Sequence, residues 1–164
     1  MSPLDWAKQP LRKYAVFDGR APRAEYWWFA LGAGILGLAL GLIDLLVLHL
    51  QVYGNYGPLG LTITAALVVP RVALFVRRLH DIDRSAWWVI LLVPSYSLLL
   101  SGGSFARLLH PIPSIPSLVN VVALLAYGIA AVIMFIFSVC AGTDGPNVYG
   151  PDPYGGDSLE EVFA

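Results

Sequence analysis

Long apolar stretches separated by short polar segments dominate this sequence. A helix that crosses a bilayer needs about 20 mostly apolar residues, and four segments are candidates: 26–50, 59–76, 87–100 and 118–141. The third is short and contains Pro94, so it must tilt or continue past Gly102 to cross. The pattern predicts an all-α integral membrane protein that folds as a four-helix transmembrane bundle.

Before the first apolar stretch, Leu4, Leu11, Tyr14 and Phe17 recur at spacings of seven, three and three residues. This spacing places them on one helical face. Nearby basic residues suit a helix lying on an anionic membrane surface. We therefore expect an interfacial N-terminal helix, which Pro10 divides into two short pieces.

Composition agrees with a membrane protein. Hydrophobic residues make up 57% of the 164 residues and charged residues 13%, and the mean hydropathy is +0.69. A soluble chain carries about 25% charged residues, and a chain this short has too much surface to hide so many apolar side chains. A single Cys140 excludes an internal disulfide, and a net charge of −1 gives no field that attracts nucleic acid.

The basic residues indicate an orientation. With four crossings, nine of the ten Lys and Arg residues share the side that holds both ends and the loop 77–86, and Arg107 is the tenth. The positive-inside rule places that side in the cytoplasm. We expect a multi-pass protein of the bacterial inner membrane with both termini cytoplasmic.

Two ionisable residues, Asp44 and Arg71, lie within apolar stretches. At 1.5 Å per residue their depths differ by about 16 Å, so we predict no salt bridge between them. Arg71 is expected to reach Glu25 or a lipid phosphate at the cytoplasmic face. Asp44 lies near the outer boundary, where His49, a polar helix end or water satisfies it, and an ion or proton site is the alternative.

Small residues line one face of the first apolar stretch. Gly34, Gly37 and Gly41 follow helical spacing and lead to Asp44. Such a face allows two helices to approach closely. We expect it to pack inside the bundle, with contact between two copies of the chain as the alternative.

Three polar motifs remain: FDGRAPRAEYWW (17–28), RRLHDIDRSAWW (77–88) and AGTDGPNVYGPDP (141–153). In order and spacing they resemble the bacterial inner-membrane proteins called the domain of unknown function 805 family. Ala86 stands where that family usually has Gly. The resemblance implies a small multi-pass inner-membrane protein and implies no activity.

The motifs concentrate arginine beside acidic residues. Arginine makes planar two-point contacts with carboxylates and phosphates, so the cluster either joins the three segments or grips a phospholipid headgroup. The candidate ligand-binding residues are Arg20, Arg23, Glu25, Arg71, Arg77, Arg78, His80, Asp81 and Arg84.

The third motif is rich in turn formers. Through Asn147, Tyr149 and Asp152 we expect it to fold over the arginines and complete a cap on a single domain, 1–154, followed by a mobile acidic tail, 155–164. No metal-ligand spacing is recognisable, and we expect no metal, no cofactor and no assigned catalytic residue.

The leading functional hypothesis is a non-enzymatic membrane protein whose Arg-rich face binds anionic lipid or a partner protein. A small oligomeric transporter or channel is one alternative. An enzyme that acts on lipid headgroups with His80 and Asp81 is another. A second copy of the chain or another membrane protein remains an alternative partner.

Overall fold

A computed structural model describes residues 2–49, 52, 57–92 and 117–154, with the side chains of all but 117–124. Within these residues the chain is helical and forms no β-strand. The α-helices are α1 (Pro3–Arg12), α2 (Arg23–Ile43), α3 (Pro58–Ala66), α4 (Val68–Asp81) and α7 (Ser117–Val139). A π-helical turn, Asp44–Leu48, extends α2, and a 3₁₀ helix, Ala86–Leu91, follows α4.

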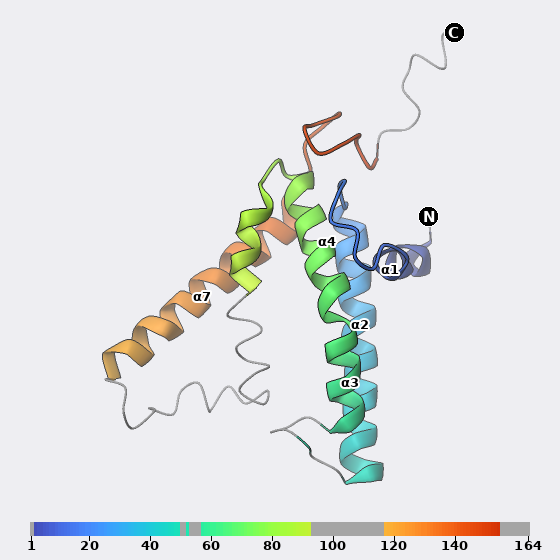
Figure 1. Cartoon of the computed structure of the whole chain (residues 1–164), viewed down its shortest axis with the longest axis vertical. Coiled ribbons are helices and arrows are strands. Elements are labelled where there is room, and N and C mark those ends of the chain that lie inside the picture. Colours follow the sequence, from blue (N-terminus) through green and yellow to red (C-terminus); the bar gives the residue numbers. More distant parts are fainter. Residues whose placement is uncertain (1, 50–51, 53–56, 93–116, 155–164) are drawn as a thin grey trace.

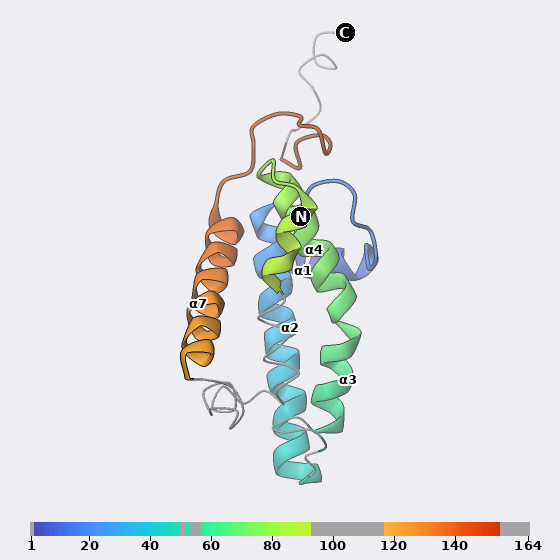
Figure 2. The same ribbon diagram turned by 60° about the vertical axis from the view of Figure 1, so that its left-hand side comes forward.

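Two helical segments are long and apolar enough to cross a membrane. One joins α2 to the π-helical turn over Arg23–Leu48, and the other joins α3 to α4 over Pro58–Asp81. They lie side by side in both ribbon views (Figures 1 and 2). Only 11% of the most apolar stretch of the first is buried, and 39% of the second. The core helix of a soluble protein buries most of its surface, so this exposed apolar surface suits lipid.

The second long segment is interrupted between α3 and α4. Leu67 forms a turn there, and Pro70 follows inside the first turn of α4. Proline has no backbone N–H to donate to the carbonyl four residues earlier. The interruption therefore lies where the sequence removes a helical hydrogen bond.

The last helix, α7, joins the others near its C-terminal end and diverges from α2 and α4 toward its N-terminal end (Figure 1). Aromatic edge contacts hold the joined end: Trp27 on Phe135, with centroids 6.2 Å apart, and Trp88 on Phe137, at 5.4 Å. The Trp27 indole also donates to the carbonyl of Ser138 at 3.3 Å. These contacts fix α7 to α2 and to the 3₁₀ helix at one level.

The four-helix bundle remains a prediction. Of the expected third span, 87–100, residues 93–100 lie outside the described residues, and 87–91 form part of the 3₁₀ helix. The expected fourth span, 118–141, corresponds to α7. The acidic tail, 155–164, also lies outside the described residues.

The N-terminal helix forms as a single element rather than two. A capping box between Ser2 and Asp5 starts α1, which passes through Pro10 and ends at Arg12. The expectation that Pro10 divides the helix was wrong, because Pro10 lies in the last turn, where it removes only one backbone bond. The helix crosses α2, and its Ala7 lies 3.9 Å from the Cβ position of Gly32. Figure 1 shows α1 end-on beside the upright α2.

Candidate functional site

The three polar motifs meet at one end of α2 and α4, where they form a compact polar cap (residues 17–25, 77–84 and 141–154). Asp81, at the end of α4, lies at its centre and is buried. Its Oδ1 accepts from Arg20 Nε at 3.0 Å, and its Oδ2 accepts from Nη1 of Arg78. One carboxylate thus joins the first motif to the second.

Arg20 also binds the third motif, and Arg78 binds the end of α7 and the residue just before that motif. Arg20 donates to the carbonyls of Thr143 at 2.5 Å and Gly145 at 2.6 Å. Arg78 donates to the carbonyl of Phe137 at 3.1 Å and to that of Cys140. Buried arginine is stable only where carboxylates and carbonyls accept from its donors. The two guanidinium groups are therefore committed to holding the cap together.

Backbone and amide hydrogen bonds close the cap. Thr143 N donates to the Asp81 carbonyl at 2.8 Å, and Asn147 Nδ2 donates to the His80 carbonyl at 2.9 Å. Asn147 Oδ1 accepts from Tyr149 N at 2.9 Å. At Gly142, an added Cβ would lie 2.5 Å from Asp81 Oδ2, so the motif needs glycine at this close approach.

The remaining cap residue, Asp152, holds the end of the third motif. Its Oδ2 accepts from Gly145 N at 3.2 Å and its Oδ1 from Tyr154 N at 2.9 Å. The side chain thus stabilises a turn. The third motif lies over the buried Arg20, which donates to two of its carbonyls.

His80 is held by a carbonyl and an aromatic ring. Its Nδ1 lies 3.2 Å from the Gly19 carbonyl oxygen, and its ring stacks on Tyr149 with centroids 4.0 Å apart and planes 3° apart. The Asp81 carboxylate accepts from two arginines rather than from His80. In this geometry His80 positions the third motif, and Asp81 does not orient it as a base.

Glu25 and Arg77 form a second buried ion pair. Glu25 Oε1 accepts from Arg77 Nη1 at 2.8 Å, and both side chains are almost fully buried. The sequence offered Glu25 or a lipid phosphate as the partner of Arg71, but the basic partner of Glu25 is Arg77. Arg77 lies deeper in the cap because it is six residues, about 9 Å, further along the helix.

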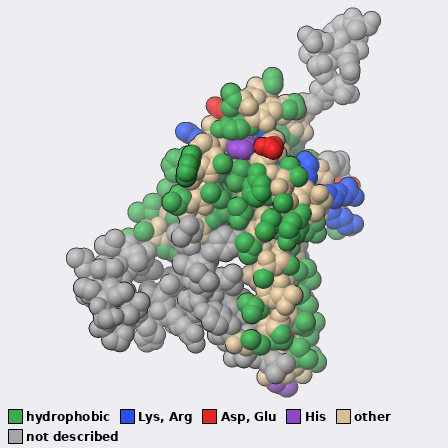
Figure 3. Space-filling model, in the orientation of Figure 1, with side chains coloured by type: hydrophobic (Ala, Val, Ile, Leu, Met, Phe, Trp, Pro, Cys, Tyr) green, Lys and Arg blue, Asp and Glu red, His purple; other side chains and the backbone are tan. Residues whose placement is uncertain are grey.

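Three candidate arginines remain on the surface: Arg23, Arg71 and Arg84. Arg23 makes one long hydrogen bond, 3.4 Å, to the Val139 carbonyl. Arg71 and Arg84 form no side-chain hydrogen bond or ion pair with another described residue. Basic side chains also gather over α1, as Figure 3 shows, where Lys8 and Arg12 are exposed.

Asp44 lies at the opposite end of α2 and is buried. Its carboxylate accepts from the backbone N–H groups of Leu59 at 3.2 Å and Gly60 at 2.7 Å. These are among the first donors of α3, which a helix leaves without internal partners. Of the partners considered from the sequence, the polar helix end is the one present, and Asp44 forms no ion pair with Arg71.

The small-residue face of α2 is open in the described part of the chain. A Cβ at Gly34, Gly37 or Gly41 would meet nothing within 4 Å. The expected packing of this face inside the bundle is therefore absent among the described helices. The side chain of Asp44, at the end of this face, packs against α3 instead.

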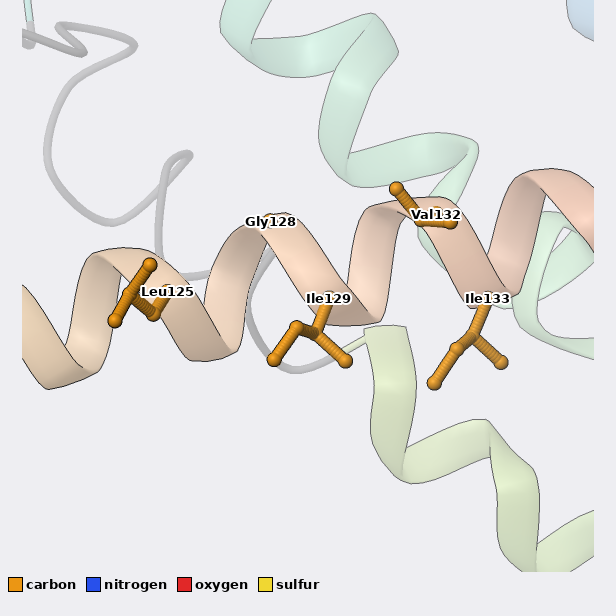
Figure 4. Close-up of a pocket in the computed structure, with 5 residues that line it drawn as sticks. All are labelled: Leu125, Gly128, Ile129, Val132 and Ile133. Carbon is orange, nitrogen blue, oxygen red and sulfur yellow. The ribbon is translucent and has the colours of Figure 1, made fainter.

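The described part of the structure includes an apolar hollow. A hollow of about 360 Å³ lies along α7, lined by Leu125, Gly128, Ile129, Val132 and Ile133 (Figure 4). Its lining is apolar and comes from one helix, so it offers no group for acid, base or nucleophilic chemistry. No cluster of three metal-ligating side chains occurs in the parts that the structure describes.

Comparison with known proteins gives a family without an assigned activity. The family model described as "Protein of unknown function (DUF805)" matches residues 14–151. Inner membrane protein YhaH of Escherichia coli (strain K12) is 35% identical over 150 residues, which cover 92% of this chain and 97% of YhaH. Inner membrane protein YhaI of the same strain is 30% identical, with 92% and 96% covered. No solved structure matches.

Proposed function

Because the chain belongs to the DUF805 family of proteins of unknown function, and is a bacterial inner-membrane protein like its relatives YhaH and YhaI, we propose that it binds the phosphate groups of anionic phospholipids without catalysing a reaction. The binding residues in this proposal are the exposed basic side chains near the cap. The cap end faces the cytoplasm, where the positive-inside rule places basic residues.

The observation that carries the proposal is the position of Arg71. This side chain is exposed within the apolar part of α4, residues 68–76, and pairs with no acid in the described residues, while Glu25 is taken by Arg77. A guanidinium group on a lipid-facing surface is costly unless it reaches the headgroup region and finds an oxyanion. A lipid phosphate supplies that acceptor in two-point geometry.

Helix α1 adds exposed basic residues to the proposed surface. The hydroxyl of Tyr14 donates to the Ala66 carbonyl at 2.6 Å, which fixes the chain just after α1 within five residues of Arg71 along α3 and α4. Lys8 and Arg12 are exposed on α1, and each basic residue near an anionic surface contributes about 1 kcal/mol. The exposed Leu4 suits contact with the acyl boundary.

The buried arginines take another role in this proposal. Arg20 and Arg78 donate to Asp81 and to backbone carbonyls, so the lipid phosphate is assigned to Arg71 rather than to them. The contacts of His80 and Asp81 give no support to an enzyme acting on headgroups, and those of Asp44 give none to an ion pathway.

Native mass spectrometry of the gently extracted protein tests the proposal. We expect the wild type to retain phosphatidylglycerol in preference to phosphatidylcholine, Arg71→Gln to lose most of that preference, and Arg71→Lys to keep part of it. Arg107→Gln is the matched control, because it removes the same charge from the loop that the sequence places on the opposite side. Equal retention of both lipids by the wild type, or unchanged preference in Arg71→Gln, contradicts the proposal.

A further inference from the structure

One edge of a buried guanidinium group is without an acceptor. Arg77 donates through Nη1 to Glu25, but its Nε and Nη2 atoms are buried and donate to no described residue. The neighbouring Arg20 and Arg78 use all three nitrogens of their guanidinium groups. Arg77 therefore differs from the arginines that hold the cap together.

The free atoms form a two-point donor. The N–H groups of Nε and Nη2 lie parallel along one edge of the planar group, and their spacing matches two oxygens of a carboxylate or phosphate. A buried donor without an acceptor costs about 1–3 kcal/mol, and more when it is charged. The edge thus has both the geometry and the energetic need for an oxyanion.

The local charge also favours an anion. Glu25 balances Arg77, and Lys13, which follows α1, lies near enough to Glu25 to interact with it electrostatically. Basic groups therefore outnumber the acid around this pair, so a bound oxyanion would neutralise an excess of positive charge.

We propose that the Nε–Nη2 edge of Arg77 is a binding site for a phosphate oxyanion, either free phosphate or the phosphodiester of a lipid headgroup. Arg77 is inaccessible in this arrangement, so a ligand reaches the edge only through a local opening of the segments packed over it. The site is separate from the exposed Arg71 and does not depend on its binding lipid.

Thermal unfolding of the purified full chain in detergent tests this site. Inorganic phosphate and a short-chain phosphatidylglycerol are added separately. A ligand at a hundredfold excess over Kd raises Tm by about 5–10 °C for a chain of this size. A rise with phosphate assigns the site to the free anion, and a rise with the lipid alone assigns it to a headgroup. No rise with either ligand overturns the proposal.

The variant Arg77→Lys keeps the positive charge beside Glu25 and removes the two-point edge. We expect it to lose the Tm rise, and the matched Arg107→Lys, in the loop that the sequence places on the opposite side of the membrane, to keep it. A rise that persists in Arg77→Lys overturns the assignment. If Arg77→Lys does not fold, the ¹⁵Nε–H resonance of Arg77 in the wild type decides: it moves downfield with the ligand, and an unchanged resonance overturns the site.

Discussion

The Tyr14 hydroxyl lies 2.6 Å from the carbonyl oxygen of Ala66 and donates to it. Ala66 is four residues before Pro70, so in an uninterrupted helix its carbonyl would accept from the N–H that proline lacks. The segment after α1 thus supplies the missing donor at the junction of α3 and α4. One hydrogen bond stabilises the helix interruption and also fixes the segment after α1 against α3 and α4.

A double-mutant cycle measures this coupling. We expect Tyr14→Phe to lower the free energy of unfolding by about 1 kcal/mol, because it leaves the Ala66 carbonyl without its donor. In a Pro70→Ala background, residue 70 regains an N–H, and the same substitution should cost much less. Equal costs in the two backgrounds, measured by chemical unfolding, would show that the hydroxyl does not serve this carbonyl.

Asp81 and Asp83 offer a matched pair of carboxylates two residues apart. Asp81 is buried between Arg20 and Arg78, so Asp81→Asn leaves buried positive charge uncompensated and should cost about 3–5 kcal/mol. Asp83 is exposed at φ +55°, a conformation that Asn tolerates well. We expect Asp83→Asn to stay within about 0.5 kcal/mol of the wild type. Similar unfolding midpoints for both variants would contradict a structural role for Asp81.

The three motifs and the long apolar helices follow from local sequence signals. Apolar run length, basic flanks and turn residues act over a few positions, so they can be read without the fold. The fixed rise per residue of a helix also predicted that Asp44 and Arg71 lie at different depths, and the two form no ion pair. Because motifs 17–28 and 77–88 interleave arginine with acid, the sequence indicated that a charge network was available to join them.

The individual pairings could not be predicted from the sequence. Glu25 pairs with Arg77 rather than Arg71 because the register of α4 against α2 is set by side-chain packing between distant segments. Pro70 did indicate that, in a continuous helix, the Ala66 carbonyl would have no backbone N–H donor four residues later. Its partner, Tyr14, lies 52 residues earlier, and no local pattern connects the two.

The capping box of α1 gives a pH dependence. Hydrogen bonds from the Ser2 side chain and backbone hold the pKa of Asp5 below its ordinary value of 3.8. A lowered folded-state pKa stabilises α1 above the unfolded value, and this contribution is lost as pH falls through the folded value. We expect the helical Cα shifts of Pro3–Arg12 to decrease below about pH 4. The variant Asp5→Asn serves as the control, because it removes the titrating group and should flatten this profile.

Substitutions of Asp44 test whether its carboxylate serves as a helix cap or as an ion or proton site. As a cap it accepts from the N–H groups of Leu59 and Gly60, and the positive end of the α3 dipole favours its charge. Asparagine caps helices nearly as well as aspartate, whereas loss of an N-terminal cap to alanine costs about 1 kcal/mol. We therefore expect Asp44→Ala to lower the free energy of unfolding by about that amount, and Asp44→Asn by clearly less.

The test is which variant loses more free energy of unfolding, because both substitutions remove the charge and only Asn keeps a hydrogen-bond acceptor. If the carboxylate bound a cation or carried a proton, Asn and Ala would be equally damaging to any ion-dependent stability. A third variant, Gly57→Ala, places a Cβ 2.6 Å from Asp44 Oδ2 and should displace the carboxylate without removing it. Because the cap depends on geometry, this displacement should destabilise α3 even though the charge remains.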